Sequence, residues 1–503
     1  MSVPLFTVGF TMIFTAMLLG LMPEAFVVYL GVSAFVLFLI SCAFRERTVM
    51  LVLASVFVIC FLIFFKTEYV YKPVVSNAGK SAQIVGQVVD SDKVKVTDGP
   101  LAGTTIKVSS KNTVLELNDM VRFRTKVYAL WEYNKSQNLY LGCTIYGDVD
   151  VTKYEDVYQE LPVYKRFSSF VRQKCFDISS YLETRLISSL PEDMAYVLFG
   201  MLIGEKSKLP QGIYEDFQRA GIVHLLAVSG FHTSLWSMIF YRFLLKRGVN
   251  MRLAAAMTIG FVLAFLALTG FSKSTIRASV ALMVFFLGRI LSRQSDSKSS
   301  LGLSAIVILL INPFAGGDIG FLLSFFSTLG ILVIYPKMLS KCRDLLSERI
   351  ANRIVRDRVL SAVSIVLVTV STLIFTLPVT MVMIGEVSLI SPLTNLLVTS
   401  VASIAIMLSG VATVVSAVPI IGAFEKPLML ISGLIVKYVV FISSFISSFS
   451  FITVDIGSNI AMVTIAGVLI LIGFSLILRA SSKRTILLST LLIFASLITH
   501  YLV

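Results

Sequence analysis

Long apolar runs alternate with short polar segments over most of this chain. Three apolar runs come first, near residues 4–22, 24–42 and 49–65, and a long polar stretch follows them from Lys66 to Lys165. Several of the runs reach or approach the roughly 20 apolar residues that cross a bilayer as a helix. The pattern therefore predicts a polytopic α-helical membrane protein with an inserted polar domain.

Beyond residue 222 the apolar runs follow one another almost without pause. The candidates are 222–245, 252–271, 274–292, 300–312, 319–336, 359–381, 396–417, 428–449, 458–479 and 485–502. With the first three runs they predict about thirteen membrane elements, of which 300–312 is short enough to be a half-span. No Lys or Arg precedes the first run and no small-residue cleavage motif follows it, so we expect no removable signal peptide.

Basic residues indicate the orientation, because Lys and Arg accumulate in cytoplasmic loops. With the helices as predicted, five basic clusters fall on one side of the membrane. They are Arg45 and Arg47; Lys246, Arg247 and Arg252; Arg289, Arg293 and Lys298; Lys337, Lys341, Arg343, Arg349, Arg353, Arg356 and Arg358 in one long loop; and Arg479, Lys483 and Arg484. The N-terminus is then cytoplasmic and residues 66–165 are external.

Composition supports this class and limits what the charge can mean. Of 503 residues, 56% are hydrophobic and 14% charged, which excludes an ordinary soluble domain. The net charge of +14 largely reflects the basic loops, since residues 66–165 hold 13 Lys/Arg against 12 Asp/Glu. A nucleic-acid surface there must therefore be a local patch. Its candidates are Lys93, Lys95, Lys107, Lys111, Arg122, Arg124 and Lys126.

The polar domain has the pattern of a small β structure. Short runs rich in β-branched residues, at 83–89, 104–108, 120–128 and 144–151, are separated by Gly, Asp, Asn and Lys clusters. An OB-like barrel fits their length and spacing, and a small β domain without a ligand is the alternative. We divide the chain into N-terminal helices (1–65), the β domain (66–160), an interfacial helix with a polar loop (161–220) and a membrane domain (221–503).

Residues 163–190 have the periodicity of an amphipathic helix, with aromatic and aliphatic residues on one face and charges on the rest. Such a helix can lie in the membrane interface or pack on the β domain, and both placements remain open. Pro191, Glu192 and Asp193 then predict the start of another helix, since Pro and acidic residues favour a first turn.

The segment from His224 to His232 carries the most distinctive chemistry, because it holds a Ser-Gly pair and two of the three histidines. Zinc would need three or four ligands, which these histidines and the remote His500 do not supply. A serine hydrolase would need an activated Ser229; Ala227 to Gly230 is close to the G-x-S-G of rhomboid-type proteases but lacks the first glycine. The third interpretation is structural, with Ser229 and Gly230 permitting a break or a close approach of helices.

Five cysteines show no metal-site spacing. Cys143 and Cys175 both fall in the part predicted to be external, so they can form a disulfide or remain two free thiols. We expect no metal and no cofactor.

Prolines and glycines interrupt several apolar runs, at Asn312-Pro313, Gly316-Gly317, Leu377-Pro378 and Ser391-Pro392. Broken helices are tolerated in membranes where the freed backbone is buried or lines water. Their number favours a pathway through the bundle, although each one alone is explained by a packing kink.

These motifs together resemble those of the ComEC-type competence proteins. The segment Gly221 to His232 is similar to that family's signature. The other matching segments, in the same order, are Gly204-Glu205-Lys206-Ser207-Lys208-Leu209, Ser274 to Arg277-Ala278, Asn312-Pro313, Gly320-Phe321-Leu322-Leu323-Ser324-Phe325, Leu377-Pro378 and Ser391-Pro392-Leu393-Thr394-Asn395. The resemblance spans most of the chain, including the leading helices and the β domain.

The resemblance implies a channel that imports single-stranded DNA through the bilayer during natural transformation. The residues His224, Ser229, Gly230 and His232 would form the pore entrance. Cationic path candidates are Lys206, Lys208, Arg219, Lys273 and Arg277, and supporting polar residues are Glu205, Asp318, Ser324, Glu386 and Asn395. On the external domain, DNA would meet Lys93, Lys95, Arg122, Arg124, Lys126, Tyr128 and Trp131.

The chain departs from the fullest family pattern at its C-terminal end. Many relatives carry a metallo-β-lactamase-like domain with an H-x-H-x-D-H cluster, which three histidines cannot supply. We therefore expect no enzymatic activity here, and a separate nuclease. Since no G-x-x-x-x-G-K-[ST] loop is present, we also expect a cytoplasmic ATP-driven helicase and an external DNA receptor as partners. The rival functions are an intramembrane serine hydrolase and a transporter of small molecules or lipids.

Overall fold

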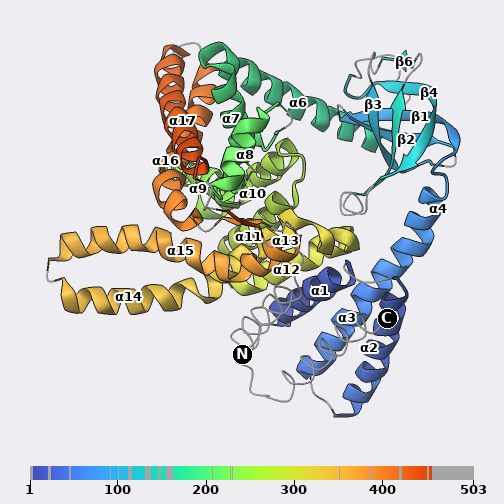
Figure 1. Cartoon of the computed structure of the whole chain (residues 1–503), viewed down its shortest axis with the longest axis horizontal. Coiled ribbons are helices and arrows are strands. Elements are labelled where there is room, and N and C mark those ends of the chain that lie inside the picture. The colour runs from blue at the N-terminus through green and yellow to red at the C-terminus, as the bar shows by residue number, and fades with distance from the viewer. Residues whose placement is uncertain are drawn as a thin grey trace. The chain divides into compact units, whose positions relative to one another are not determined.

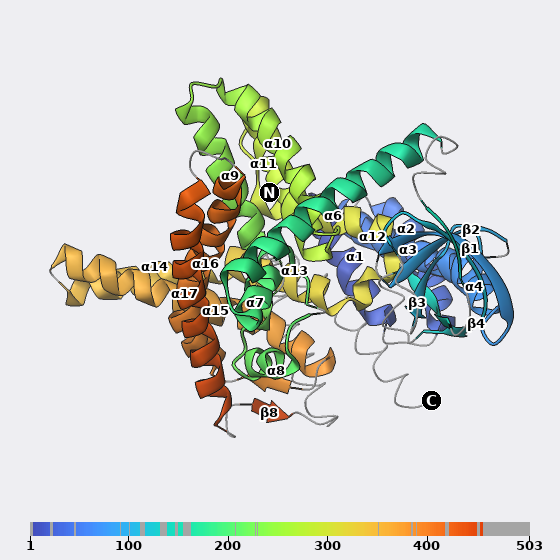
Figure 2. The same cartoon turned by 90° about the horizontal axis from the view of Figure 1, so that it is seen from above.

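The protein folds as two units that interleave along the chain (Figures 1 and 2). One unit holds Val3–Asp177 and Ala305–Asp318, and the other holds Ile178–Ser304 and Ile319–Val503. The computed structural model describes residues 4–20, 24–44, 47–90, 92–99, 101–110, 116–130, 138–145, 149–153, 162–206, 208–226, 228, 230–350, 352–383, 386–388, 390–417, 422–449 and 453–455.

The first unit contains a closed β-barrel. Its strands are β1 (Ser81–Asp90), β2 (Lys93–Asp98), β3 (Thr105–Ser110), β4 (Met120–Ala129), β5 (Leu139–Ile145) and β6 (Asp150–Thr152). They are ordered β1-β2-β3-β5-β4-β6, and β1 also pairs with β4, which closes the first five strands. Strand β3 runs parallel to β5, whereas the other pairs in this sheet are antiparallel. This topology confirms the predicted OB-like barrel.

Two strand predictions were wrong or incomplete. Strand β2 was not predicted, because it has only six residues and its alternation rests on two of them, Val94 and Val96, which point into the barrel core. The run predicted at 144–151 is divided between the end of β5 and the start of β6, and residues 146–148 lie outside the described part. The prediction joined two strands, although Gly147-Asp148 in the sequence is a turn signal that could have separated them.

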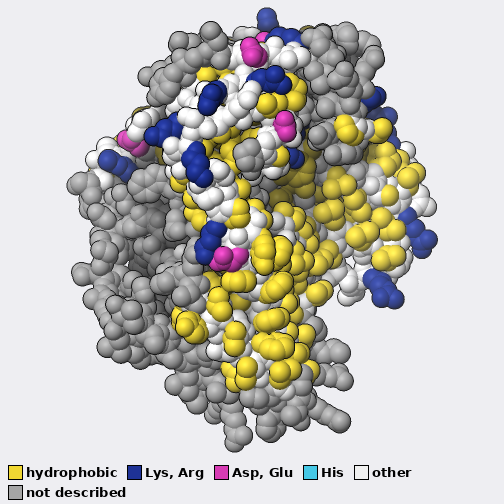
Figure 3. Space-filling view, turned by 90° about the vertical axis from the view of Figure 1, so that its right-hand side faces the viewer, with side chains coloured by type: hydrophobic (Ala, Val, Ile, Leu, Met, Phe, Trp, Pro, Cys, Tyr) yellow, Lys and Arg dark blue, Asp and Glu magenta, His cyan; other side chains and the backbone are white. Residues whose placement is uncertain are grey.

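Three helices precede the barrel, as predicted: α1 (Pro4–Gly20), α2 (Glu24–Phe44) and α3 (Arg47–Lys66). Helix α3 continues through a π-helical turn, η1 (Thr67–Tyr71), into α4 (Lys72–Val75) directly before β1. Apolar side chains such as Val32 and Phe61 are 59% and 54% exposed and cover the outer faces of α2 and α3 (Figure 3). A face of this kind is stable against acyl chains rather than water.

The Asn312-Pro313 motif forms a polar joint within the first unit. Helix α12 (Ser297–Ile311) ends there and the short 3-10 helix η5 (Pro313–Gly317) follows. Lys66 Nζ donates to Asn312 Oδ1 at 2.8 Å and to Asn138 Oδ1 at 2.6 Å, and Asn312 Oδ1 also accepts from the backbone N–H of Phe314. The predicted break is therefore present, and its asparagine links the end of α3 to the barrel and η5.

Helix α6 (Val163–Ser189) confirms the predicted amphipathic helix. Its first half packs on the barrel, where Asn118 donates to Gln173 Oε1 at 3.1 Å and accepts from Arg172 at 3.1 Å. Phe167 and Phe170 nevertheless remain 69% and 52% exposed. One face of the helix thus contacts the barrel. The exposed aromatic residues are compatible with the predicted placement in the membrane interface.

The second unit is almost entirely helical (Figure 2). Its helices are α7 (Glu192–Ile203), α8 (Gln211–Arg219), α9 (Gly230–Lys246), α10 (Met251–Leu268), α11 (Lys273–Ile290), α13 (Ile319–Val333), α14 (Tyr335–Arg349), α15 (Arg353–Met383), α16 (Ser391–Ser416) and α17 (Glu425–Ser447). Two short strands, β7 (Glu386–Ser388) and β8 (Thr453–Asp455), pair antiparallel. Across the described residues of both units, six helical segments are long and apolar enough to cross a membrane. The runs predicted at 458–479 and 485–502 lie outside the described part.

Two predictions about breaks and loops were wrong. The basic stretch at 337–358 is not a loop, because α14 and the first half of α15 form a helical hairpin there (Figure 1). The half-buried residues Met338, Cys342 and Leu346 recur every four positions on α14 and give it a helical stripe. Helix α15 continues through Pro378, which therefore causes no break.

We predict that Gly330 fixes the packing of α13 on α15. A Cβ atom at this position would lie 2.1 Å from the backbone oxygen of Ser371, so Gly330→Ala should force the helices apart and cost about 1–3 kcal/mol of stability. Gly260 on α10 is the matched control, because no atom lies within 4 Å of its hypothetical Cβ. Thermal unfolding of the purified protein in detergent measures both, and equal melting temperatures for the two variants would contradict the assignment.

Candidate functional site

The signature segment is a compact turn before a membrane helix. Gly221 has φ +74°, a short 3-10 helix, η4 (Val223–Leu226), follows, and α9 begins only at Gly230. The prediction of one apolar helix from residue 222 was therefore wrong at its start, because the left-handed backbone at Gly221 and the 3-10 turn interrupt it. His224 is exposed and His232 is 2% exposed. Ser229 lies outside the described residues.

The polar loop after α7 packs on this turn through glycine. Gly204 ends α7 in the left-handed conformation at φ +92°, and a Cβ there would lie 3.2 Å from Val228 Cγ2. One turn earlier, a Cβ at Gly200 would lie 3.8 Å from the backbone oxygen of Leu226. The absence of side chains thus allows α7 and its loop to approach the signature closely.

The later Ser-Pro motif contacts the other end of the signature. A Cβ at Gly221 would lie 2.5 Å from Ser391 Cβ and 3.1 Å from Ser388 Cβ. Ser388 Oγ also donates to the backbone oxygen of Arg219 at 2.7 Å. Ser388 and the Ser391 of the Ser-Pro pair therefore pack where α8 ends, although some 170 positions separate the two segments in the chain.

Gly230 and Arg277 form the centre of the arrangement. The guanidinium of Arg277 covers Gly230 so closely that a Cβ there would lie 2.6 Å from Arg277 Nη2. Arg277 Nε donates to Ser324 Oγ at 2.9 Å, and Ser274 Oγ donates to the backbone oxygen of Gly320 at 3.4 Å. The signature, the S-x-x-R-A helix start on α11 and the G-F-L-L-S-F segment on α13 therefore meet at one guanidinium.

The charge of Arg277 is buried without an acidic neighbour in the described part of the chain. Only 9% of the residue is exposed, and no described carboxylate forms an ion pair with it. The side chains of Thr275 and Ser279 nearby on α11 are fully buried, and Ser279 Oγ has no described hydrogen-bond partner. A cation with so few partners in a low dielectric attracts any anion that reaches it.

The other predicted path residues lie apart from Arg277 in their interactions. Lys208 Nζ donates to Glu183 Oε1 at 2.5 Å, a hydrogen bond that raises the pKa of Lys208. Lys206 lies over the ring of Tyr214 at 5.8 Å, and burial lowers its pKa. Arg219 is exposed at the end of α8, and Lys273 is half-buried as the first residue of α11. Lys206 and Lys208 thus interact with Tyr214 and Glu183, on α8 and α6, and not with Arg277.

The predicted supporting polar residues have mixed surroundings. Asn395 is 9% exposed and accepts from Thr399 Oγ1 at 3.1 Å. Asp318 is 5% exposed and terminates η5. Glu205 is exposed, while the side chain of Glu386 is outside the described part. Asp216 Oδ1, which no prediction named, accepts from Ser447 Oγ and links α8 to α17.

The barrel carries a basic stripe on the outer face of β4. Arg122, Arg124 and Lys126 alternate with the buried Val121 and Phe123, so all three project outward. Successive residues of such a row are about 7 Å apart, because each strand residue advances roughly 3.4 Å. No described carboxylate pairs with any of the three, so the stripe keeps its charge.

Tyr128 extends the stripe by one more outward position. Its ring lies over Gly142 of β5, since a Cβ at Gly142 would be 2.7 Å from the ring, and the residue is 45% exposed. By contrast, Lys93 on β2 forms ion pairs with Asp90 at 2.6 Å and Asp92 at 3.6 Å, and Lys95 is exposed without a described ion pair. Trp131 lies outside the described residues.

Cys143 and Cys175 are both free thiols, so the structure contains no disulfide between them. Cys143 is buried in the barrel core, and this burial raises its pKa to about 12. A thiol that stays protonated in a closed core is a poor nucleophile. Among the described residues no group of three His, Cys, Asp or Glu side chains could hold a metal ion.

Lys437 is a second charged residue that the sequence analysis missed. Lys437 lies in the middle of α17 and is exposed, between the exposed apolar residues Leu434 and Phe441. It is the one charge in the apolar sequence from 427 to 449. A lone lysine at membrane depth usually marks a polar path or a partner, so it could have been identified by that criterion alone.

Several known proteins are similar to this chain. ComE operon protein 3 of Bacillus subtilis (strain 168) is 27% identical over 154 residues, which are 31% of this chain and 20% of that protein. The uncharacterized protein MG316 of Mycoplasma genitalium is 26% identical over 249 residues, 48% of this chain and 58% of that protein. Its homologue from Mycoplasma pneumoniae is 31% identical over 162 residues, which are 31% of this chain and 41% of that protein. The matches thus span less than two thirds of these relatives, and no solved structure matches the chain.

A family model described as Competence protein matches residues 201–496, more than half of the chain. The matched region includes each segment that meets the signature, from the loop at Gly204 through Arg277 and Ser324 to Ser391. The chain therefore belongs to the Competence protein family.

Proposed function

We propose that this protein conducts single-stranded DNA across the cytoplasmic membrane during natural transformation. One observation carries the proposal: the family's motif segments converge on a buried guanidinium, Arg277, that has no described acidic partner. A DNA strand bears one negative charge per nucleotide, so a fixed cation inside the bundle stabilises each phosphate in turn. Ser324 holds the guanidinium in place without neutralising it.

The barrel supplies the first contact with DNA in this proposal. The row of Arg122, Arg124 and Lys126 offers positive charge along the outside of β4, and the Tyr128 ring offers a stacking surface at its end. Grooves that bind single strands without sequence preference combine these two elements. The barrel would lie outside the cell, the N-terminus would be cytoplasmic, and the basic segments would face the cytoplasm.

Other proteins complete the process in this proposal. An external receptor delivers DNA, a separate nuclease degrades the second strand, and a cytoplasmic ATP-driven helicase pulls the strand inward. The sequence holds no G-x-x-x-x-G-K-[ST] loop with which this chain could hydrolyse ATP itself.

We predict that replacing Arg277 and Lys273 with Gln reduces DNA uptake roughly tenfold or more, because the strand loses cationic contacts in a low-dielectric site. Uptake of labelled DNA into a deletion strain measures the effect, with protein level checked by immunoblot. Arg277→Lys, which keeps the positive charge, should retain part of the uptake. Arg252→Gln, which removes an exposed charge at the start of α10, should leave uptake unchanged. Unchanged uptake in the double variant at normal protein level would refute the assignment.

A second prediction concerns the basic stripe. Replacing Arg122, Arg124 and Lys126 with Gln should weaken oligonucleotide binding and lower the salt dependence of log K by about 2, the value expected for three phosphate contacts on a single strand. Tyr128→Ala should cost roughly tenfold in affinity through lost stacking. Fluorescence titration of the full-length protein at several salt concentrations measures both effects.

The matched control for this experiment is Lys93→Gln with Lys107→Gln, since Asp90 and Asp92 already offset those charges. An equal change in slope for the control pair would show that DNA does not follow β4.

A third prediction separates the channel from a serine hydrolase. A channel should retain most of its DNA uptake after Ser229→Ala, because the change removes one hydroxyl and no charge. An intramembrane hydrolase would lose all activity with its nucleophile. Loss of uptake in Ser229→Ala at normal protein level would favour the hydrolase.

A further inference from the structure

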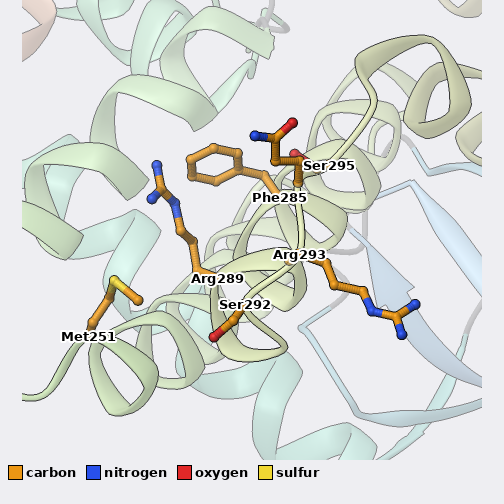
Figure 4. Close-up of a pocket in the computed structure, with 8 residues that line it drawn as sticks. Met251, Phe285, Arg289, Ser292, Arg293 and Ser295 are labelled. Atoms are coloured by element: carbon orange, nitrogen blue, oxygen red, sulfur yellow. The ribbon is translucent and has the colours of Figure 1, made fainter.

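A pocket of about 530 Å³ lies where α11 ends and α10 begins (Figure 4). Its lining combines two cationic, two hydroxyl and two apolar side chains. They are Arg289, Arg293, Ser292, Ser295, Phe285 and Met251. The candidate path around Arg277 and the basic stripe on β4 share no residue with it.

The backbone at the end of α11 builds this pocket. Ser292 adopts a left-handed conformation at φ +54°, and the N–H of Arg293 donates to the backbone oxygen of Gly288 at 2.8 Å. This is the hydrogen bond of a Schellman motif, which reverses the chain at a helix end. A Cβ at Gly288 would lie 2.8 Å from the backbone oxygen of Arg293, so the reversal needs glycine there.

The lining places two arginine side chains at the end of α11. Arg289 lies over the ring of Phe285 at 5.2 Å, and Figure 4 shows the Arg293 side chain extending to the other side of the helix end. Within the described part of the chain, neither guanidinium has an ionic partner. Met251 is the first residue of α10, whose helix N-terminus adds partial positive charge. A phosphate group in the pocket would be attracted by this positive charge.

The surroundings favour a phosphate that is attached to hydrocarbon. Leu287 and Leu291, on the same helix end, are 46% and 66% exposed, and Leu253 near the start of α10 is 56% exposed. Helix α10 is one of the candidate membrane spans. Apolar residues beside a cationic pocket at the end of a membrane helix fit the headgroup and acyl chains of a lipid. A free strand of DNA would instead need open stacking faces, and Arg289 already covers Phe285.

We propose that this pocket binds the phosphate headgroup of an anionic phospholipid, whose acyl chains lie against Leu287, Leu291 and Leu253. The lipid headgroup would offset positive charge at the end of α11 and would hold this end of α11 and the start of α10 at the membrane surface. This role is independent of what the protein transports.

The test uses the purified full-length protein in a neutral detergent, titrated with short-chain fluorescent phosphatidylglycerol and with the matching phosphatidylcholine. We expect phosphatidylglycerol to bind roughly tenfold more tightly, because only it offers an uncompensated phosphate charge. Arg289→Gln with Arg293→Gln should remove this preference, and Lys298→Gln, an exposed cation outside the pocket, should preserve it. Equal binding of both lipids to the wild type would overturn the proposal.

Two further arms identify the source of the phosphate. Inorganic phosphate or a single-stranded oligonucleotide, added at the same concentration of negative charge as the lipid, should fail to displace the bound lipid. Displacement by either one would overturn the lipid assignment. The pair Arg289→Lys and Arg293→Lys should keep most of the preference while folding normally. A lipid-free melting temperature equal to that of the wild type shows that the Gln variants fail in binding rather than in folding.

Discussion

A buried positive charge at Arg277 is the constraint on which the membrane domain depends. A guanidinium in a low-dielectric interior costs several kcal/mol unless its surroundings compensate for the lost water. The described structure gives it one hydroxyl acceptor, Ser324, and a close backbone at Gly230. Three helices must therefore stay in one arrangement around a guanidinium whose hydrogen-bonding capacity is only partly used in the described structure.

Glycine makes this arrangement possible. Hypothetical Cβ atoms at Gly204, Gly221 and Gly230 would meet Val228, Ser391 and Arg277 within 3.2 Å. Helices in a membrane gain no hydrophobic energy from each other, so their packing rests on close approach and on polar contacts. The motif glycines are therefore the points at which segments distant in the chain touch the signature.

The barrel shows how far a periodic pattern determines structure. The alternation in β4 places Val121 and Phe123 inside and Arg122 and Arg124 outside, and both the strand and its exposed charge could be predicted from the sequence. Strand β2 was not predicted, because it has only six residues and only Val94 and Val96 show the same alternation. Ion pairs decide which of the exposed cations keep their charge unpaired. Asp90 and Asp92 offset Lys93, whereas no described acid offsets the row of cations on β4. Such pairs depend on which strands become neighbours, and residue order does not reveal that.

The sequence by itself determined the membrane class, the OB-like barrel, the amphipathic α6 and the motif residues, because hydrophobic periodicity and composition are local properties. It misplaced the start of α9, a hairpin in the basic stretch and a break at Pro378, since each depends on what packs alongside. Only the tertiary structure shows that Arg277, among the five cationic candidates, is buried beside the signature. Lys206 lies over the ring of Tyr214, and Lys208 donates a hydrogen bond to Glu183, which is 25 positions away in the chain. The availability of a charge is a property of its neighbours in space, so the fold had to decide it.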